Sequence, residues 1–179
     1  MKNMKVILKL LRPHQWAKNS FVFLPLFFNG KFTNLEFLFI TIIVFFVFSF
    51  AASGIYCFND ILDAEKDKLH PIKRHRPIAS GNIGKCSAFF IMLICFIISL
   101  LTIYFFSSYI KTHVYNLYWV IAIYILMNIF YCIKLKKMII VDVFVIAIGF
   151  VLRIFAGGLA TGILLSHWLV LMTFLLALL

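Results

Sequence analysis

The sequence predicts an all-α fold, a polytopic transmembrane helical bundle. Hydrophobic residues make up 64% of the chain and charged residues 13%, whereas soluble proteins are near half apolar and about a quarter charged. Most apolar residues fall in runs of roughly 20, the length that an α-helix needs to cross a bilayer. A chain of this composition cannot cover itself with polar surface. We therefore expect lipid to solvate it, as in a multi-pass integral membrane protein.

Six apolar runs follow one another along the chain. The four that are long enough to span on their own are Leu35–Phe58, Ala88–Tyr109, Val114–Ile133 and Met138–Leu159. The first run, Trp16–Phe28, is shorter and contains Pro25, so we expect a kinked span or one extended by the turns from Lys5 to Leu11. A sixth run begins near Ile163, which gives about five complete spans plus part of a sixth. No linker or internal repeat divides the chain, so we expect a single transmembrane domain over residues 1–179.

The basic residues are concentrated in three segments. Fourteen of the seventeen Lys and Arg residues lie before or at the start of the first run, after the second run, or after the fourth run. By the positive-inside rule, we expect the N-terminus and both basic loops on the cytoplasmic side of the inner membrane. The formal charge of +11 then favours membrane lipids and phosphate-bearing substrates as partners, and we expect no nucleic acid. A homo-oligomer is compatible with the sequence.

Four of the six acidic residues lie together where the second apolar run ends. At about 100° per residue, one helix face would carry four oxygen-bearing side chains and Glu65 would project away from it. The four are Asn59, Asp60, Asp63 and Asp67. Carboxylates gathered at the edge of a low-dielectric medium repel one another unless a cation lies among them. Mg²⁺ suits oxygen ligands and is usually shared with substrate phosphates, so we expect Mg²⁺ as the cofactor and these four residues as its ligands.

A solvated acidic helix end is the alternative interpretation of this segment. The carboxylates would then pair with neighbours such as Lys66, Lys68 or Arg74. The spacing N-D-x-x-D-x-x-x-D, its position at the end of a span and the scarcity of acids elsewhere favour the metal site.

A basic loop from His70 to Gly81 follows the acidic segment, marked by two prolines and a glycine. Lys73 and Arg76 provide donors for phosphate oxygens. Such a loop would also serve as a topology anchor. An acidic metal site followed at once by a basic loop fits a complex of metal and diphosphate better than either feature alone.

These two motifs together resemble the UbiA superfamily of intramembrane prenyltransferases. N-D-x-x-D-x-x-x-D followed by K-x-x-R-P-I-A-S-G is similar to the first metal motif of that family and its adjoining loop. Stretches that resemble the decaprenyl-phosphate phosphoribosyltransferase branch are Arg12–Asn19, Tyr131–Lys136 and Asp142–Gly158. Many aromatic prenyltransferases carry Y-x-x-x-K after the fourth helix, but Leu135 stands at the lysine position here, which favours the phosphoribosyl branch. Family members usually have about nine helices, so we expect the chain to be the N-terminal part of a longer domain and to lack residues needed for activity.

The resemblance implies an Mg²⁺-dependent transferase. It would move a phosphoribosyl group from 5-phosphoribosyl diphosphate, arriving from the cytoplasm, to a polyprenyl (decaprenyl) phosphate in the bilayer, and would release diphosphate. The catalytic residues would be Asp60, Asp63 and Asp67. The substrate-binding residues would be Lys18, Asn19, Lys73, Arg76, Tyr131, Lys134, Lys136 and Arg153. The alternative within the family is transfer of a prenyl group from a prenyl diphosphate to an aromatic quinone precursor.

Two charged residues are predicted to lie inside the fifth apolar run, where charges are costly and usually functional. Asp142 lies near its cytoplasmic end and is expected to pair with Lys136 or Lys137. Arg153 lies deeper, and we expect it either to hold an anionic group in a central cavity or to hydrogen-bond between helices.

A transporter with the aspartates as a cation or proton site is the competing class. It would require acids at mid-membrane depth. The acids lie at the end of a span beside a basic loop, which favours the enzyme.

Overall fold

The computed structural model describes residues 2–110 and 114–178, and all regular structure in these ranges is helical. The elements in order are α1 (Lys2–Leu11), η1 (Pro13–Phe23), α2 (Leu24–Phe28), α3 (Leu35–Leu69), η2 (Lys73–His75), α4 (Lys85–Phe105), α5 (Val114–Ile133), η3 (Leu135–Lys137), α6 (Ile139–Thr161) and α7 (His167–Leu178). The α elements are α-helices and the η elements are 3₁₀-helices. The predicted all-α fold is therefore confirmed.

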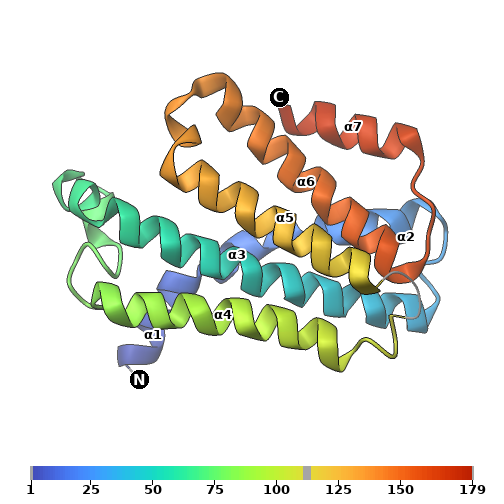
Figure 1. Cartoon of the computed structure of the whole chain (residues 1–179), viewed down its shortest axis with the longest axis horizontal. Helices are drawn as coiled ribbons and strands as arrows, with labels where there is room; N and C mark the ends of the chain where they lie inside the picture. The colour runs from blue at the N-terminus through green and yellow to red at the C-terminus, as the bar shows by residue number, and fades with distance from the viewer. Residues whose placement is uncertain (1, 111–113, 179) are drawn as a thin grey trace.

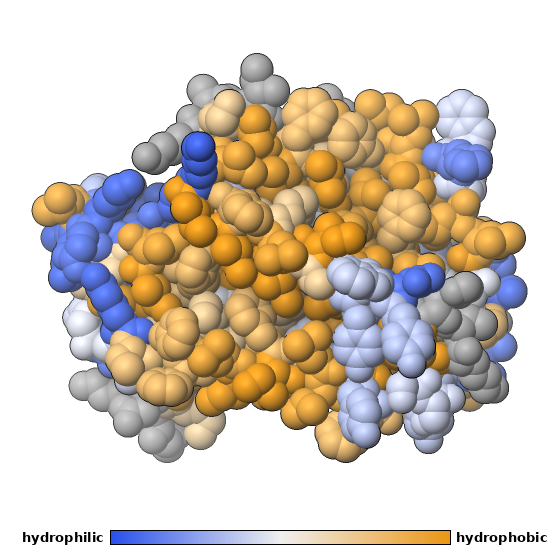
Figure 2. Space-filling model, viewed as in Figure 1, coloured by the Kyte–Doolittle hydropathy of each residue, from blue (hydrophilic) through white to orange (hydrophobic). Residues whose placement is uncertain are grey.

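Within the described part of the chain, four helices, α3 to α6, are long and apolar enough to cross a membrane. They run up and down along the long axis of the molecule, and α7 folds back along α6 (Figure 1). Figure 2 shows hydrophobic residues over most of one face, with hydrophilic residues gathered at the end where α3 leads into α4. Large apolar side chains such as Phe90, Leu126 and Leu176 are more than half exposed. Lipid contact accounts for this surface, since water would not.

Helix α3 is the centre of the bundle and packs against α1, η1, α4, α5 and α6. Asn34 caps its N-terminus by accepting hydrogen bonds from the backbone N–H groups of Glu36 and Phe37. At 35 residues the helix is about 52 Å long, well beyond the roughly 30 Å of a bilayer core. The apolar part therefore crosses the membrane, and the last turns carry the aspartates beyond it.

The first predicted span is not an α-helix, and this corrects the α-helical expectation for Trp16–Phe28. The chain turns at Arg12, winds as a 3₁₀-helix through η1 and becomes α-helical only in the short α2. Pro25 lacks an N–H and would clash with the carbonyl of residue 21 in a continuous α-helix, so it opposes that conformation. Because a 3₁₀-helix rises about 2.0 Å per residue, η1 and α2 together reach about 30 Å with fewer residues than an α-helical span needs.

The buried residues of η1 and the start of α2 recur at intervals of three residues. Trp16 is half-buried, and Asn19, Val22 and Pro25 are buried. Side chains three apart stack on one face of a 3₁₀-helix, so Trp16, Asn19 and Val22 form a single stripe facing the bundle, and Pro25 follows them at the start of α2. Gly157 of α6 meets that stripe so closely that a Cβ there would lie 2.1 Å from the carbonyl oxygen of Val22.

Five chain segments meet at one end of the bundle. Figure 1 shows the C-terminal ends of α3 and α5 there, beside the starts of α4 and α6. The end of α1 joins them, because Lys9 Nζ donates a hydrogen bond to the backbone carbonyl of His75, 2.8 Å away. The three basic segments of the sequence are thus brought together around the acidic end of α3.

We predict that Gly157→Ala destabilises the bundle. The added methyl group would overlap the Val22 carbonyl, so α6 and η1 must separate, and the free energy of unfolding should fall by about 1–3 kcal/mol. Thermal unfolding of the purified protein in detergent measures this. Gly84→Ala is the control, since a Cβ there meets no atom within 4 Å; equal stability of the two variants would contradict the close approach.

Candidate active site

Asp60 is the most deeply buried of the clustered carboxylates, with 2% of its surface exposed. Its Oδ1 accepts hydrogen bonds from Arg12 Nη2 at 2.6 Å and from Arg76 Nη1 at 3.2 Å. Its Oδ2 is buried and has no hydrogen-bond partner among the described residues. One oxygen of this carboxylate is therefore paired with two guanidinium groups, while the other is buried without a protein partner among the described residues.

Arg76 joins two of the aspartates. The same Nη1 atom that reaches Asp60 also donates to Asp67 Oδ2 at 2.7 Å, and Asp67 is 4% exposed. Asp63, one turn from each along α3, accepts a hydrogen bond from Lys136 Nζ at 2.6 Å. Asp60, Asp63 and Asp67 thus face the bundle and the basic segments, as the spacing predicts.

The pairing pattern distinguishes this cluster from a solvated acidic helix end. The partners of the three aspartates lie 48, 16, 9 and 73 residues away in sequence. Glu65 differs in exposure: its side chain is exposed, and it pairs with the exposed side chains of Lys68 and Lys85. Carboxylates that are tied to three separate segments form part of a built site, and the predicted orientation of Glu65 away from them is confirmed.

A polar cavity of about 320 Å³ lies beside these residues. Its lining combines two carboxylates with basic side chains from α3, the basic loop and η3. The lining residues are Asp63, Lys66, Asp67, His70, Lys73 and Lys136. Such a lining suits a ligand that carries both cation and anion, as a diphosphate with its metal does.

The residues present fit a divalent cation only with help from other ligands. Within residues 2–110 and 114–178, no three His, Cys, Asp or Glu side chains form a group that could hold a metal ion by themselves. The unpartnered Oδ2 of Asp60 and the two cavity carboxylates are nevertheless the oxygen donors that Mg²⁺ prefers. Mg²⁺ keeps several waters and binds through one or two carboxylates plus substrate phosphates, so this donor set is compatible with it.

Arg153 lies at the centre of a separate buried network and is 7% exposed. Its Nε donates to Asn19 Oδ1 at 2.8 Å, its Nη2 to the Tyr124 hydroxyl at 2.9 Å and its Nη1 to the Gly149 carbonyl at 2.6 Å. Asn19 in turn donates to Ser49 Oγ at 3.0 Å. The guanidinium therefore joins α6 to η1 and α5, which is the hydrogen-bonding alternative expected from the sequence.

The remaining predicted residues take several positions. Lys18, Lys73 and Lys134 are exposed, and of these Lys73 lines the cavity. Asn59 and Tyr131 are half-buried, and Asn59 joins none of the pairs described above. Their substrate or metal roles stay predictions.

The expected pair between Asp142 and Lys136 is not formed among the described residues, and Lys136 pairs with Asp63 instead. The Oδ1 of Asp142 is buried without a hydrogen-bond partner among the described residues, and Tyr131 lies beside this carboxyl group. The alternative pairing with the Lys137 side chain lies outside the described residues.

Two kinds of functional candidate were missed by sequence reasoning. Arg12 was not predicted as a site residue although it holds Asp60, since its contact with α3 depends on how the chain turns before η1. Lys66 and His70 also line the cavity. The sequence suggests Lys66 only as a salt-bridge partner in the alternative interpretation, and His70 only as the start of the basic loop. The signals for Arg12 are its position directly before Pro13 and its place at the start of the Arg12–Asn19 stretch that carries the family resemblance.

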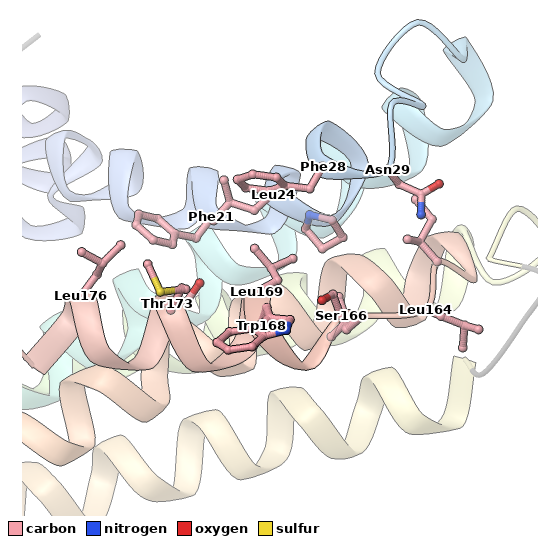
Figure 3. Close-up of a pocket in the computed structure, with 14 residues that line it drawn as sticks. Phe21, Leu24, Phe28, Asn29, Leu164, Ser166, Trp168, Leu169, Thr173 and Leu176 are labelled. Atoms are coloured by element: carbon pink, nitrogen blue, oxygen red, sulfur yellow. The ribbon is translucent and has the colours of Figure 1, made fainter.

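An apolar groove of about 690 Å³ lies between η1–α2 and α7. Figure 3 shows Phe21, Leu24 and Phe28 on one wall and Trp168 and Leu169 on the other. The α2 end of this groove is at the opposite end of the long axis from the aspartates (Figure 1). Its mainly apolar lining suits hydrocarbon and not a diphosphate.

This chain belongs to the UbiA prenyltransferase family, whose model matches residues 20–179. The decaprenyl-phosphate phosphoribosyltransferase of Corynebacterium glutamicum is 38% identical over 169 residues, which cover 92% of this chain and 49% of that protein. The enzyme of the same description from Mycobacterium tuberculosis is 36% identical over 169 residues, covering 92% and 54%. The chain thus spans about half the length of these curated relatives.

The fold is shared with a solved UbiA homologue from Archaeoglobus fulgidus. That structure, bound to GPP and Mg²⁺, matches with a TM-score of 0.77 at 21% identity and covers 97% of this chain and 60% of the homologue. The similarity supports the predicted bundle architecture. Family membership and the four apolar helices make this an integral membrane protein of a transferase family.

We predict that Arg153 is needed for helix assembly. Arg153→Met would leave buried acceptors on Asn19 and Tyr124 unpaired, so the free energy of unfolding should fall by about 2–4 kcal/mol. Tyr124→Phe removes one of these bonds and should lower it by about 0.5–1 kcal/mol. Thermal unfolding in detergent distinguishes the two. Unchanged stability of Arg153→Met would instead favour the anion-binding role.

Proposed function

We propose that the protein is an Mg²⁺-dependent intramembrane transferase that moves a phosphoribosyl group from 5-phosphoribosyl diphosphate to a polyprenyl phosphate and releases diphosphate. The observation that carries the proposal is the polar cavity in which Asp63 and Asp67 lie beside Lys73 and Lys136. Carboxylates suit the metal and lysines suit phosphate oxygens. The similarity to two decaprenyl-phosphate phosphoribosyltransferases supports this choice of donor and acceptor.

The metal ligands would be the three aspartates, with Asn59 as a further oxygen donor. Mg²⁺, when bound, would neutralise the charge that develops on the departing diphosphate. Lys73 and Lys136, both at the cavity, would bind phosphate oxygens and hold the leaving group in one orientation. Arg76 lies half-buried beside Asp60 and Asp67 and would balance their charge.

The acceptor would reach the site from the bilayer. Its phosphate oxygen would attack carbon 1 of the ribose as the bond from that carbon to the diphosphate oxygen breaks. A phosphate is already anionic at neutral pH, so no residue of the chain needs to remove a proton from it. The mainly apolar groove between η1–α2 and α7 supports a hydrocarbon tail as a further ligand.

The proposed orientation follows from charge. The basic segments meet at the end of the bundle that carries the aspartates, and positive segments favour the cytoplasmic side. The protein would lie in the inner membrane with this end facing the cytoplasm. The water-soluble sugar diphosphate would then enter the site from the cytoplasm.

A prenyl diphosphate is the alternative donor. The carboxylates and lysines would bind its diphosphate in the same way, and the family description favours a prenyl group. Only the group transferred and the acceptor would differ.

An assay of the donor separates the two reactions. Membranes that contain the full-length protein should convert labelled phosphoribosyl diphosphate and polyprenyl phosphate into a lipid-linked sugar phosphate, and removal of Mg²⁺ by a chelator should stop the conversion. The organic phase of an extraction measures the product. Turnover with a prenyl diphosphate and an aromatic acceptor, together with failure of the first pair, would reverse the assignment.

The metal role of Asp63 is tested by Asp63→Asn. The amide keeps the shape of the side chain but loses its charge, so transfer should fall by about 100-fold or more, because a ligand at the leaving group is lost. Glu65→Gln is the matched control: it removes one negative charge from the same helix, two residues away, at an exposed carboxylate outside the cavity. Loss of activity in both variants would point to general electrostatics, and retention in both would remove Asp63 from catalysis.

A further inference from the structure

Arg12 is the single non-glycine residue with positive φ in the described part of the chain, at φ 52° and ψ 58°. This left-handed conformation is uncommon for a residue with a Cβ. It persists only where the surrounding structure enforces it, and such strain gathers at functional sites. The turn at Arg12 separates α1 from η1.

Ser53 of α3 holds this turn from both sides. Its hydroxyl donates to the Leu11 carbonyl at 2.8 Å and accepts from Trp16 Nε1 at 3.0 Å. Ser53 is fully buried, so water does not compete for either bond. The residues immediately before and shortly after Arg12 are thus fixed to one point on α3.

The Arg12 side chain then follows the surface of α3. Its guanidinium carbon lies 5.1 Å from the centre of the Tyr56 ring, and its Nη2 reaches Asp60 Oδ1 at 2.6 Å. Positions 53, 56 and 60 lie on one face of an α-helix. The same face therefore fixes the backbone of Arg12, its stem and its charged end.

We infer that Arg12 is a positioning residue that fixes the Asp60 carboxylate so that Oδ2 is presented to the divalent cation. Oδ1 is held by two arginines, whereas Oδ2 is buried and unpartnered among the described residues. The inference rests on the proposed function, since the cation is the Mg²⁺ of that site. Arg12 lies outside the aspartate motif, yet in this inference it orients Asp60, one of the proposed ligands of the metal ion.

The inference makes a prediction opposite in sign to simple electrostatics. Removal of a positive charge beside a carboxylate should by Coulomb's law tighten cation binding. Loss of a hydrogen bond that orients a metal-binding carboxylate instead weakens metal affinity, typically by 10–100-fold. Weaker cation binding after removal of Arg12 therefore indicates a positioning role, and tighter binding indicates a purely electrostatic one.

The test measures the binding of Mn²⁺, as a probe for Mg²⁺, by electron paramagnetic resonance of the purified protein in nanodiscs. Asp60→Asn serves as the reference for complete loss of the Asp60 carboxylate as a ligand. Arg12→Gln should raise the dissociation constant about tenfold or more, and Arg12→Lys should give an intermediate value. Arg74→Gln is the matched control, because it removes an exposed arginine of the same cytoplasmic surface and should leave the constant within about twofold. Binding by Arg12→Gln that equals or exceeds wild type would overturn the inference.

Ser53→Ala provides a variant without any change in charge. It removes both bonds that hold the turn at Arg12, so Mn²⁺ binding should weaken in the same direction as in Arg12→Gln. Thermal unfolding without metal establishes that each variant folds. If Arg12→Gln does not fold, unchanged Mn²⁺ affinity in Ser53→Ala would overturn the inference.

Transfer activity separates this inference from the proposed function. In Arg12→Gln, the Mg²⁺ concentration for half-maximal activity should rise, and excess Mg²⁺ should restore the rate. A wild-type protein inactive with every donor would defeat the proposed function, yet the Mn²⁺ measurements would still decide the role of Arg12. Normal Mg²⁺ dependence in Arg12→Gln with an active wild type would defeat the inference alone.

Discussion

The burial of negative charge at the end of α3 is the constraint on which the rest of the structure depends. Asp60 and Asp67 are almost fully buried, and a buried carboxylate is tolerated only if it is paired. Their cations come from the turn before η1 and from the basic loop, while Asp63 takes its cation from η3. Neutralising these carboxylates therefore also draws distant segments of the chain to one end of the bundle.

A second buried charge acts in the same way deeper in the bundle. Arg153 uses all three of its guanidinium nitrogens on protein acceptors from η1, α5 and its own helix. The two networks are joined by η1, which begins beside Arg12 and carries Asn19. The start of η1 is therefore held by the buried Asp60 through Arg12, and the middle of η1 is held by the buried Arg153 through Asn19.

Periodicity and composition were sufficient to predict the four long spans between Leu35 and Leu159 and the face that carries the aspartates. The sequence also predicted that Glu65 would point elsewhere, because helix geometry fixes that angle. Two features could not be predicted. The 3₁₀ conformation of η1 depends on its neighbours, although its buried residues recur every three positions, and the role of Arg12 depends on a backbone turn that local sequence does not encode. The pairing of Lys136 with Asp63, not Asp142, was likewise decided by tertiary packing.

The winding of η1 restricts how this segment can change in evolution. Its inward stripe of Trp16, Asn19 and Val22 repeats at every third residue, and Pro25 at the start of α2 keeps the same spacing. A single insertion or deletion would turn all later side chains by about 120° and carry Asn19 or Val22 out to the lipid. Length changes in this part of homologous proteins should therefore be absent, or should come in whole triplets.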